Sequence, residues 1–236
     1  MTTAAAIIIG DEILSGKFAD ENGPYLITRL RELGVDLRRL VIISDKVNDV
    51  AREVAHCSES CDYVFTTGGV GPTHDDITLQ GVAAAFDVDL VVDPTLVGLL
   101  KKYGMELNSA ALRMATVPKG SRLLSVDSHY PILQFRNVYV FPGIPKLFRT
   151  KFEAVAPELT GEKVQTARIY TNEVETLIAA RLEEVADLFP LVAIGSYPRL
   201  GESQYKVIVT LESRTPGDLQ LAYEALCRLL SVVDVL

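Results

Sequence analysis

The segment Thr66–Thr78 combines a glycine-rich turn with two adjacent carboxylates, a pattern that indicates metal-assisted phosphate chemistry. Its glycines would let backbone N–H groups approach an anion, and the helix expected after it would add a partial positive charge. Asp75 and Asp76 would repel a bare phosphate, but a divalent metal bridging carboxylate and phosphate removes this conflict. The segment has neither the Lys-Ser/Thr pair of the nucleotide-triphosphate P-loop nor the G-x-G-x-x-G spacing of dinucleotide sites.

The two carboxylates also have a structural interpretation. Asp76 or Thr78 could cap the following helix, a contact that stabilises a helix by roughly 1 kcal/mol. One cap needs only one such residue, so the pair exceeds structural need and favours a metal or ligand role for at least one carboxylate. A loop hydrogen bond explains His74 as well as general acid–base chemistry does, because the sequence offers no second histidine beside it.

Further polar residues follow the predicted strands. Glu12 stands next to a strand end and is interpreted as a functional carboxylate, whereas Asp20 fits a helix cap better than a ligand. Asp45 fits a turn and a metal ligand equally well. Three isolated basic residues could contact phosphate, namely Lys17, Lys146 and Arg149. Such residues usually lie on the solvated surface.

Strands and helices alternate around these residues. The continuous apolar run at residues 4–9 is typical of a strand buried on both faces. We predict strands over 4–9, 35–43, 62–65 and 138–141, less distinct strands over 88–92 and 122–124, and helices from Asp20 to Gly34, over 48–60, over 79–86 and over 94–103. The β-α-β-α-β order implies a mostly parallel sheet with helices on both faces.

The polar motifs fall at the carboxyl ends of these strands, where open parallel sheets bind ligands. Gly10-Asp11-Glu12, Asp45, Thr67-Gly68-Gly69 and Pro142-Gly143 each follow a predicted strand. We therefore expect them to converge on one rim of the sheet and form a composite site.

After about Gly161 the pattern changes to that of a small α+β domain, so we place one domain at 1–161 and a second at 162–236. We predict strands over 167–170, 192–196 and 205–211, with helices over 174–189 and 216–232. Gly195–Pro198 is interpreted as the loop of a hairpin. The first helix is expected to turn five side chains inward: Leu177, Ile178, Leu182, Val185 and Leu188.

Composition fits a cytoplasmic protein. The 236 residues are 48% apolar, but no apolar run is long enough to span a membrane, and we see no secretion signal. Cys57, Cys61 and Cys227 lack metal-knuckle spacing and are interpreted as buried thiols. The net charge of −8 argues against nucleic acid as a partner, since phosphate backbones need clustered Lys and Arg.

Four motifs in family order resemble the molybdopterin-binding domain superfamily of the Mog and gephyrin type. The sequences of these motifs are most similar to those of CinA-type competence/damage-inducible proteins and of the molybdopterin-binding-like domain of eukaryotic FAD synthases. The motifs are Gly10–Gly16 with Asp20 and Asn22, Thr66–Thr78, Ala115–Pro118, and Asn137–Pro145. The resemblance implies a three-layer α/β/α fold with a mostly parallel sheet, followed by the small α+β domain.

The resemblance also implies an activity, the metal-dependent hydrolysis of a nucleotide pyrophosphate such as ADP-ribose or FAD. Glu12 or Asp75 would orient or deprotonate the attacking water, and Asp45 and Asp76 would hold Mg²⁺, Mn²⁺ or Co²⁺. The expected ligand-binding residues are Gly10, Asp11, Asn22, Thr67, Gly68, Gly69, Gly71, Pro72, Thr73, His74, Pro142 and Gly143. The alternative is a module that binds molybdopterin or a nucleotide without turning it over.

Two departures from these relatives limit which of their activities we expect in this chain. Mog-type proteins carry a second Gly-Thr-Gly element and an Arg where this chain has Val70 and Thr73-His74, which argues against pterin adenylylation and molybdenum insertion. The chain ends at Leu236 without an amidohydrolase or adenylyltransferase domain, so we expect neither deamidation of nicotinamide mononucleotide nor synthesis of FAD. We expect a homodimer, because the helix at 94–103 offers apolar surface and the hairpin around Lys206–Thr210 offers a strand edge.

Overall fold

The computed structural model describes residues 1–124, 131–201 and 204–233, and the chain forms two compact units, Met1–Gly161 and Glu162–Leu236. The sequence predicts that variable loops such as Ser125–Pro131 recognise the base and sugar of a ligand, and residues 125–130 of this loop fall outside the described residues. Within those residues, none of the helices combines the length and the apolar character that crossing a bilayer requires.

The first unit is built on a six-stranded sheet, in which four neighbouring strands run parallel and two antiparallel strands follow at one side. Its order is β2 (Asp36–Ile43), β1 (Thr3–Ile9), β3 (Tyr63–Thr67), β8 (Val138–Phe141), β7 (Ile132–Phe135) and β6 (Arg122–Leu124). The mostly parallel sheet predicted from the strand and helix order is confirmed. The apolar run in β1 is buried, as a strand covered on both faces requires.

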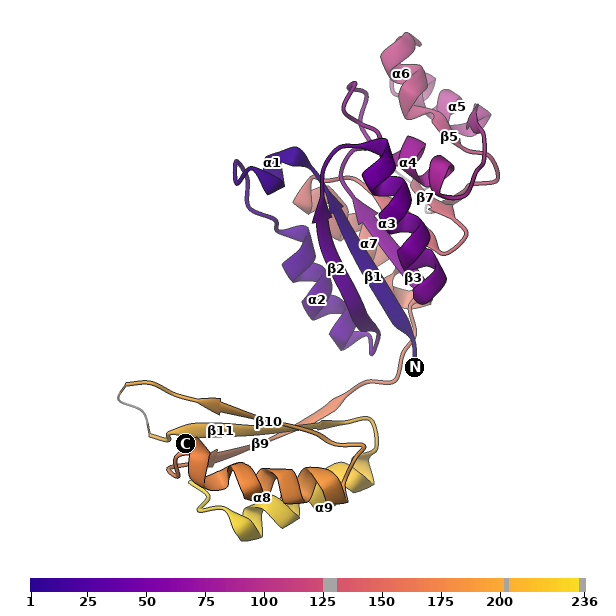
Figure 1. The fold of residues 1–236 in the computed structure, drawn as a ribbon. Coiled ribbons are helices and arrows are strands. Elements are labelled where there is room, and N and C mark those ends of the chain that lie inside the picture. The colour runs from indigo at the N-terminus through magenta and orange to yellow at the C-terminus, as the bar shows by residue number, and fades with distance from the viewer. Residues whose placement is uncertain (125–130, 202–203, 234–236) are drawn as a thin grey trace. The chain divides into compact units, whose positions relative to one another are not determined.

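Helices cover both faces of this sheet (Figure 1). The side chains of β1 are divided between these two faces. Ala5, Ile7 and Ile9 pack on the side of α3 (Val47–Ser60) and α4 (Thr78–Ala85). Ala4 and Ala6 pack on the side of α2 (Asn22–Glu32) and α7 (Pro145–Val155), which the 3₁₀ turn Ala156–Glu158 follows. Successive strand residues point to opposite faces, so one apolar segment serves two cores.

The start of α2 is held as predicted. The Asp20 carboxylate accepts hydrogen bonds from the backbone N–H groups of Asn22 and Gly23, at 2.9 and 3.1 Å from Oδ1. These groups would otherwise lack partners at a helix start. At the other end, Gly34 takes the left-handed φ of 76° expected of a glycine that closes a helix.

A smaller layer follows α4. β4 (Leu90–Val92) pairs with β5 (Thr116–Pro118) in a separate two-stranded sheet, and α5 (Pro94–Lys102) and α6 (Ser109–Met114) lie between them in sequence. The apolar side chains of α5 that suggested self-association are Leu96, Val97, Leu99 and Leu100. Leu96 and Leu100 are buried in the core of their own unit, and Val97 and Leu99 are partly buried against it. Self-association through this helix stays a prediction.

The second unit is a three-stranded antiparallel sheet packed against two helices. The sheet order is β10 (Ala193–Pro198), β11 (Val207–Ser213) and β9 (Gln165–Thr171), with α8 (Glu175–Leu188) and α9 (Pro216–Leu229). Every second residue of the central strand β11 is buried from Val207 onward, so one face of this strand meets the core.

Two expectations for this unit were wrong. Leu177 and Leu188 are each 66% exposed, because Ile178, Leu182 and Val185 already form the stripe of α8 that faces the core. The segment Gly195–Pro198 is strand rather than hairpin loop, since the pairing of β10 with β11 continues to Pro198. β10 is an edge strand, and an edge tolerates proline.

Candidate functional site

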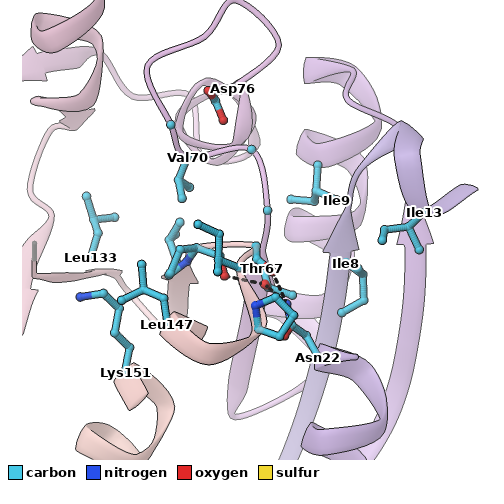
Figure 2. A pocket seen from close by; sticks show the side chains of 18 of the residues that line it. Ile8, Ile9, Ile13, Asn22, Thr67, Val70, Asp76, Leu133, Leu147 and Lys151 are labelled. Atoms are coloured by element: carbon cyan, nitrogen blue, oxygen red, sulfur yellow. Dashed lines mark hydrogen bonds between the residues drawn. The ribbon is translucent and has the colours of Figure 1, made fainter. Parts of the chain in front are cut away.

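A cavity of about 850 Å³ opens where the parallel strands of the first unit end (Figure 2). The segments that follow those strands also bond to one another. The Gly10 N–H donates to the Ile43 carbonyl at 3.1 Å, and the Gly68 N–H donates to the Phe141 carbonyl at 3.2 Å. The loops after β1, β2, β3 and β8 therefore meet at one rim, as the positions of the polar motifs predicted.

The turn after β3 forms one wall of this cavity. Gly68 and Gly69 have φ values of 106° and 61°, which L-amino acids with side chains rarely adopt. A Cβ at Gly68 would lie 2.0 Å from the Ile9 carbonyl oxygen. Thr78, at the start of α4, donates its hydroxyl to the Gly68 carbonyl at 2.7 Å and its N–H to the Gly69 carbonyl at 3.0 Å. These bonds hold the turn against the start of the helix.

The capping role considered for Asp76 or Thr78 was wrong, because neither side chain caps α4 within the part of the chain that the structure describes. Asp76 instead accepts a hydrogen bond from the Thr73 N–H at 2.7 Å and another from the Thr73 hydroxyl. Its carboxylate lies against Gly71 and borders the cavity. A larger side chain at Gly71 would displace this carboxylate.

Asn22 connects three segments at the floor of the cavity. Its Nδ2 donates to the Thr67 hydroxyl oxygen at 2.9 Å and to the Gly143 carbonyl at 2.8 Å, while the Thr67 hydroxyl donates to the Pro142 carbonyl at 2.9 Å. The buried Oδ1 of Asn22 finds no donor among the described residues. A buried acceptor without a donor costs free energy, which favours a site that a bound hydroxyl or N–H group completes.

Carboxylates gather at the rim beside the cavity. Asp45 accepts a hydrogen bond from the Asp11 N–H at 2.7 Å. Burial raises the pKa of the Asp45 carboxyl, and the charges of Glu12, Asp11 and Asp75 raise it further, against the lowering effect of the Asp11 N–H. Negative charge is therefore concentrated where a divalent cation would relieve it.

The donor set suits a cation that is shared with a ligand. Among the described residues, no three His, Cys, Asp or Glu side chains are already arranged around a metal position. Mg²⁺ is commonly held by one or two carboxylates together with substrate phosphates rather than by a protein cage. Glu12 and Asp76 border the cavity and Asp45 lies beside Gly69, so carboxylates are present at the site for that mode of binding.

The structure brings nine of the predicted site residues to the cavity wall and leaves seven outside it. Those that line the cavity are Glu12, Asn22, Thr67, Gly68, Gly69, Gly71, Asp76, Pro142 and Gly143. Those that do not are Gly10, Asp11, Asp45, Pro72, Thr73, His74 and Asp75. The His74 side chain is 95% exposed, and its Nδ1 lies 3.9 Å from the Asp75 carboxylate, which is also exposed.

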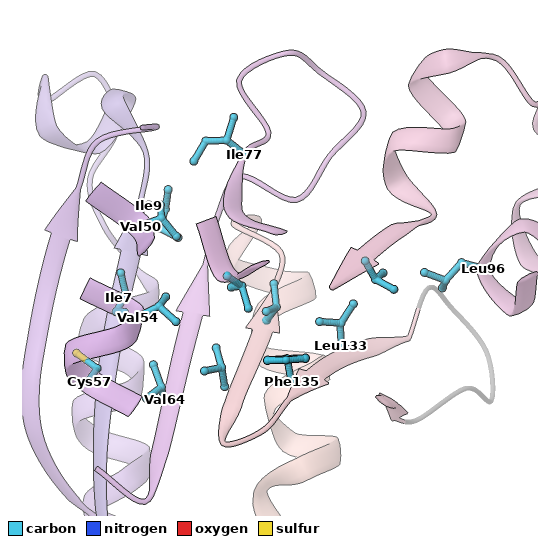
Figure 3. Packing of buried hydrophobic residues seen from close by; sticks show 14 of the residues in the cluster. Ile7, Ile9, Val50, Val54, Cys57, Val64, Ile77, Leu96, Leu133 and Phe135 are labelled. Carbon is cyan, nitrogen blue, oxygen red and sulfur yellow. The ribbon is translucent and has the colours of Figure 1, made fainter. Parts of the chain in front are cut away.

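The apolar wall of the cavity was not predicted. Leu133 of β7 and Leu96 of α5 border the cavity and also belong to the core cluster under α3 (Figure 3). Lys151 of α7 also borders it and is only 9% exposed. None of the basic residues proposed from sequence lines the cavity, and Arg149 pairs with Glu21 at 3.0 Å. The missed signal was a lysine on the apolar stripe that also carries Phe148.

Comparison with known proteins agrees with this geometry. The family described as "Probable molybdopterin binding domain" matches residues 5–161, which is most of the chain. The chain belongs to this family. A second family, "FAD synthase, middle domain", matches residues 163–235. The resemblance inferred from the four ordered motifs is therefore confirmed.

Individual relatives agree with this family assignment. A "Probable FAD synthase" of Caenorhabditis briggsae is 34% identical over 97% of the chain and 49% of the relative. A "CinA-like protein" of Myxococcus xanthus is 29% identical over 93% of the chain and 57% of the relative. The chain spans about half the length of the FAD synthase relatives.

A solved structure of similar sequence has the same fold as the first unit. The crystal structure of "the protein CinA with unknown function from Thermoplasma acidophilum" is 29% identical, with a TM-score of 0.62. The match covers 67% of this chain and 98% of that one. The α/β/α fold that the motifs implied is confirmed by this likeness.

Proposed function

We propose that the first unit hydrolyses the pyrophosphate bond of a dinucleotide such as FAD or ADP-ribose with the help of a divalent metal ion. One observation carries the proposal. A single cavity unites the glycine turn at Gly68–Gly71 with the carboxylates of Glu12 and Asp76 and with an apolar wall. Its volume of about 850 Å³ lies within the range of ligand sites that enclose drug-sized molecules.

Each part of the cavity has a role in this reaction. Backbone N–H groups of the glycine turn would bind the diphosphate. Mg²⁺, Mn²⁺ or Co²⁺, held by Asp45, Asp76 and the ligand's phosphate oxygens, would stabilise negative charge on the phosphates. Between the two candidate bases, Glu12 is favoured over Asp75, because Glu12 lines the cavity and Asp75 does not.

Glu12 would take a proton from the attacking water. The water oxygen would bond to one phosphorus as the bridging P–O bond breaks, so that FAD would yield FMN and AMP. A general base in such a position typically contributes a factor of about 10² to 10⁴ in rate. The name of the FAD synthase relatives supports FAD as a candidate substrate.

The test is to incubate the protein with FAD, ADP-ribose or NAD⁺ and each of the three metals, and to measure AMP by chromatography. We expect metal-dependent release of AMP from at least one dinucleotide. Glu12→Gln should retain binding and lose release. If calorimetry shows binding while no metal supports release, the proposed hydrolysis is wrong.

The second candidate is a module that binds the dinucleotide or a pterin without turnover. It is favoured by one observation, the buried Asn22 Oδ1, which a bound hydroxyl or N–H group would satisfy without any reaction. The same experiment separates the two functions, because tight binding without any AMP would establish the module.

A further inference from the structure

The charges around the cavity are unevenly distributed. Among the described residues that line it, four carry carboxylates: Glu12, Asp20, Glu21 and Asp76. Lys151 is the only basic residue in the described part of the lining. Among the described lining residues, only Lys151 can therefore offer a positive charge to a ligand group.

Lys151 lies on the apolar side of the cavity. It is flanked on α7 by Phe148 and Phe152, which are fully buried in the core, and Leu147 one turn earlier also borders the cavity. Figure 2 shows Lys151 extending from α7 towards the space that Leu133 borders. The ammonium group thus stands among side chains that suit the apolar, planar part of a ligand rather than its phosphates.

Burial lowers the pKa of the Lys151 ammonium, because an apolar setting disfavours its charge. A hydrogen-bond acceptor on the ligand would stabilise this charge, and a cationic group would repel it. The glycine turn and the rim carboxylates are the parts of the cavity suited to a diphosphate and its metal. The ring system of the ligand is therefore the part left to meet Lys151.

Building on the proposed function, we infer that Lys151 is a specificity-determining residue that selects dinucleotides with a neutral, carbonyl-bearing ring and discriminates against those with a cationic ring. The dione edge of a flavin offers two carbonyl oxygens that accept hydrogen bonds from an ammonium. The nicotinamide ring of NAD⁺ carries a positive charge that would be placed beside Lys151. FAD and NAD⁺ share the adenosine and the diphosphate, so the ring at the other end distinguishes them.

The experiment measures dissociation constants for FAD, NAD⁺ and ADP-ribose by calorimetry in the presence of Mg²⁺, for the unmodified protein and three variants. Lys151→Met and Lys151→Gln remove the charge at similar length. Lys146→Met is the matched control, because Lys146 stands on the same helix, is exposed and does not line the cavity. Thermal melts identify any variant whose fold is weakened.

The unmodified protein should bind FAD at least about tenfold more tightly than NAD⁺, as expected of hydrogen bonds to a charged group. Both Lys151 variants should lose most of that ratio, and Lys146→Met should keep it. The visible absorption of bound flavin should shift in the unmodified protein and in Lys146→Met, and should shift less without the Lys151 charge.

Three results would overturn this inference. Equal weakening of FAD, NAD⁺ and ADP-ribose would make Lys151 a contact of the phosphates or the adenosine. A lower melting temperature with an unchanged FAD to NAD⁺ ratio would make its role structural. Failure of the unmodified protein to bind FAD would remove the selection altogether. Because none of these readouts measures turnover, absence of hydrolysis would overturn the proposed function and leave this inference standing.

Discussion

The two sides of the cavity are built by different means. The side that is suited to phosphate is mostly backbone, made by the turn after β3 and by the loops after β1 and β8. The apolar side is made of side chains, with Leu133 on an antiparallel strand and Leu147 and Lys151 on a helix. On the backbone side, Gly68 tolerates almost no substitution. On the apolar side, substitutions should have smaller, graded effects.

Gly68→Ala should have the largest effect, because it disrupts the backbone side directly. The added Cβ would lie 2.0 Å from the Ile9 carbonyl oxygen at a φ of 106°. We expect a loss of more than about 3 kcal/mol of folding free energy, seen as a large fall in the denaturant midpoint or as insoluble protein.

Gly98→Ala is the matched control for that substitution. Gly98 lies within α5, and among the described residues nothing would meet its Cβ within 4 Å. Alanine there should stabilise the protein by about 0.5–1 kcal/mol. A folded Gly68→Ala variant with normal stability would show that the turn can shift and that the backbone side is not rigid.

Glu12→Gln should have the next largest effect, on rate rather than on stability. Removing the proposed base should lower the rate of AMP release by about 10² or more, with little change in the affinity for FAD. Asp75→Asn is the comparison, since Asp75 lies outside the cavity wall and should change the rate much less. If Asp75→Asn causes the greater loss of rate, the base has been assigned to the wrong carboxylate.

The contrast between the two sides also explains what the sequence could reveal. Gly68 and Gly69 are needed for left-handed backbone, and the β-prone run before them ends at that turn, so the site and its place on the sheet could be predicted. Asp20 was recognisable as a helix cap because few residue types perform that role. Backbone requirements leave residue types that stand out in a single sequence.

The residues of the apolar side do not stand out in a single sequence in this way. Leu133 and Lys151 are ordinary residues of a strand and a helix, and their positions depend on contacts between segments far apart in sequence. The exposed Leu177 and Leu188 were misassigned for a related reason, because apolar character does not say which stripe of a helix meets the core. The strand at Gly195–Pro198 was missed because glycine and proline usually mark turns.

Leu147→Ala should show the graded response of the apolar side. Leu147 is partly buried and borders the cavity, so truncation removes contact with the ring of the ligand while the phosphate side is unchanged. We expect FAD to bind about fivefold more weakly, equivalent to roughly 1 kcal/mol of lost apolar burial. Inorganic pyrophosphate should bind as before, and calorimetry with both ligands checks this. Equal loss for both ligands would mean that the two sides are not independent.

Measured without added metal, Asp45→Asn should change stability least, and it should raise stability where Gly68→Ala lowers it. The fold raises the pKa of the Asp45 carboxyl, chiefly by burial, so folding favours its neutral form. The stabilising contribution of that neutral form is lost as pH rises through the raised pKa, and ionised Asp45 therefore lowers stability near neutral pH. Asparagine is neutral at every pH and can still accept the hydrogen bond from the Asp11 N–H. The variant should melt at a higher temperature than the parent at about pH 8, by roughly 2 °C or less, and this difference should close towards about pH 4.

Asp49→Asn is the control of opposite sign, because a hydrogen bond from Ser44 lowers the pKa of the Asp49 carboxyl and its charged form is the one that folding favours. A lower melting temperature for Asp45→Asn at neutral pH would mean that the carboxylate stabilises the rim, and the concentration of negative charge there would no longer argue for a bound cation.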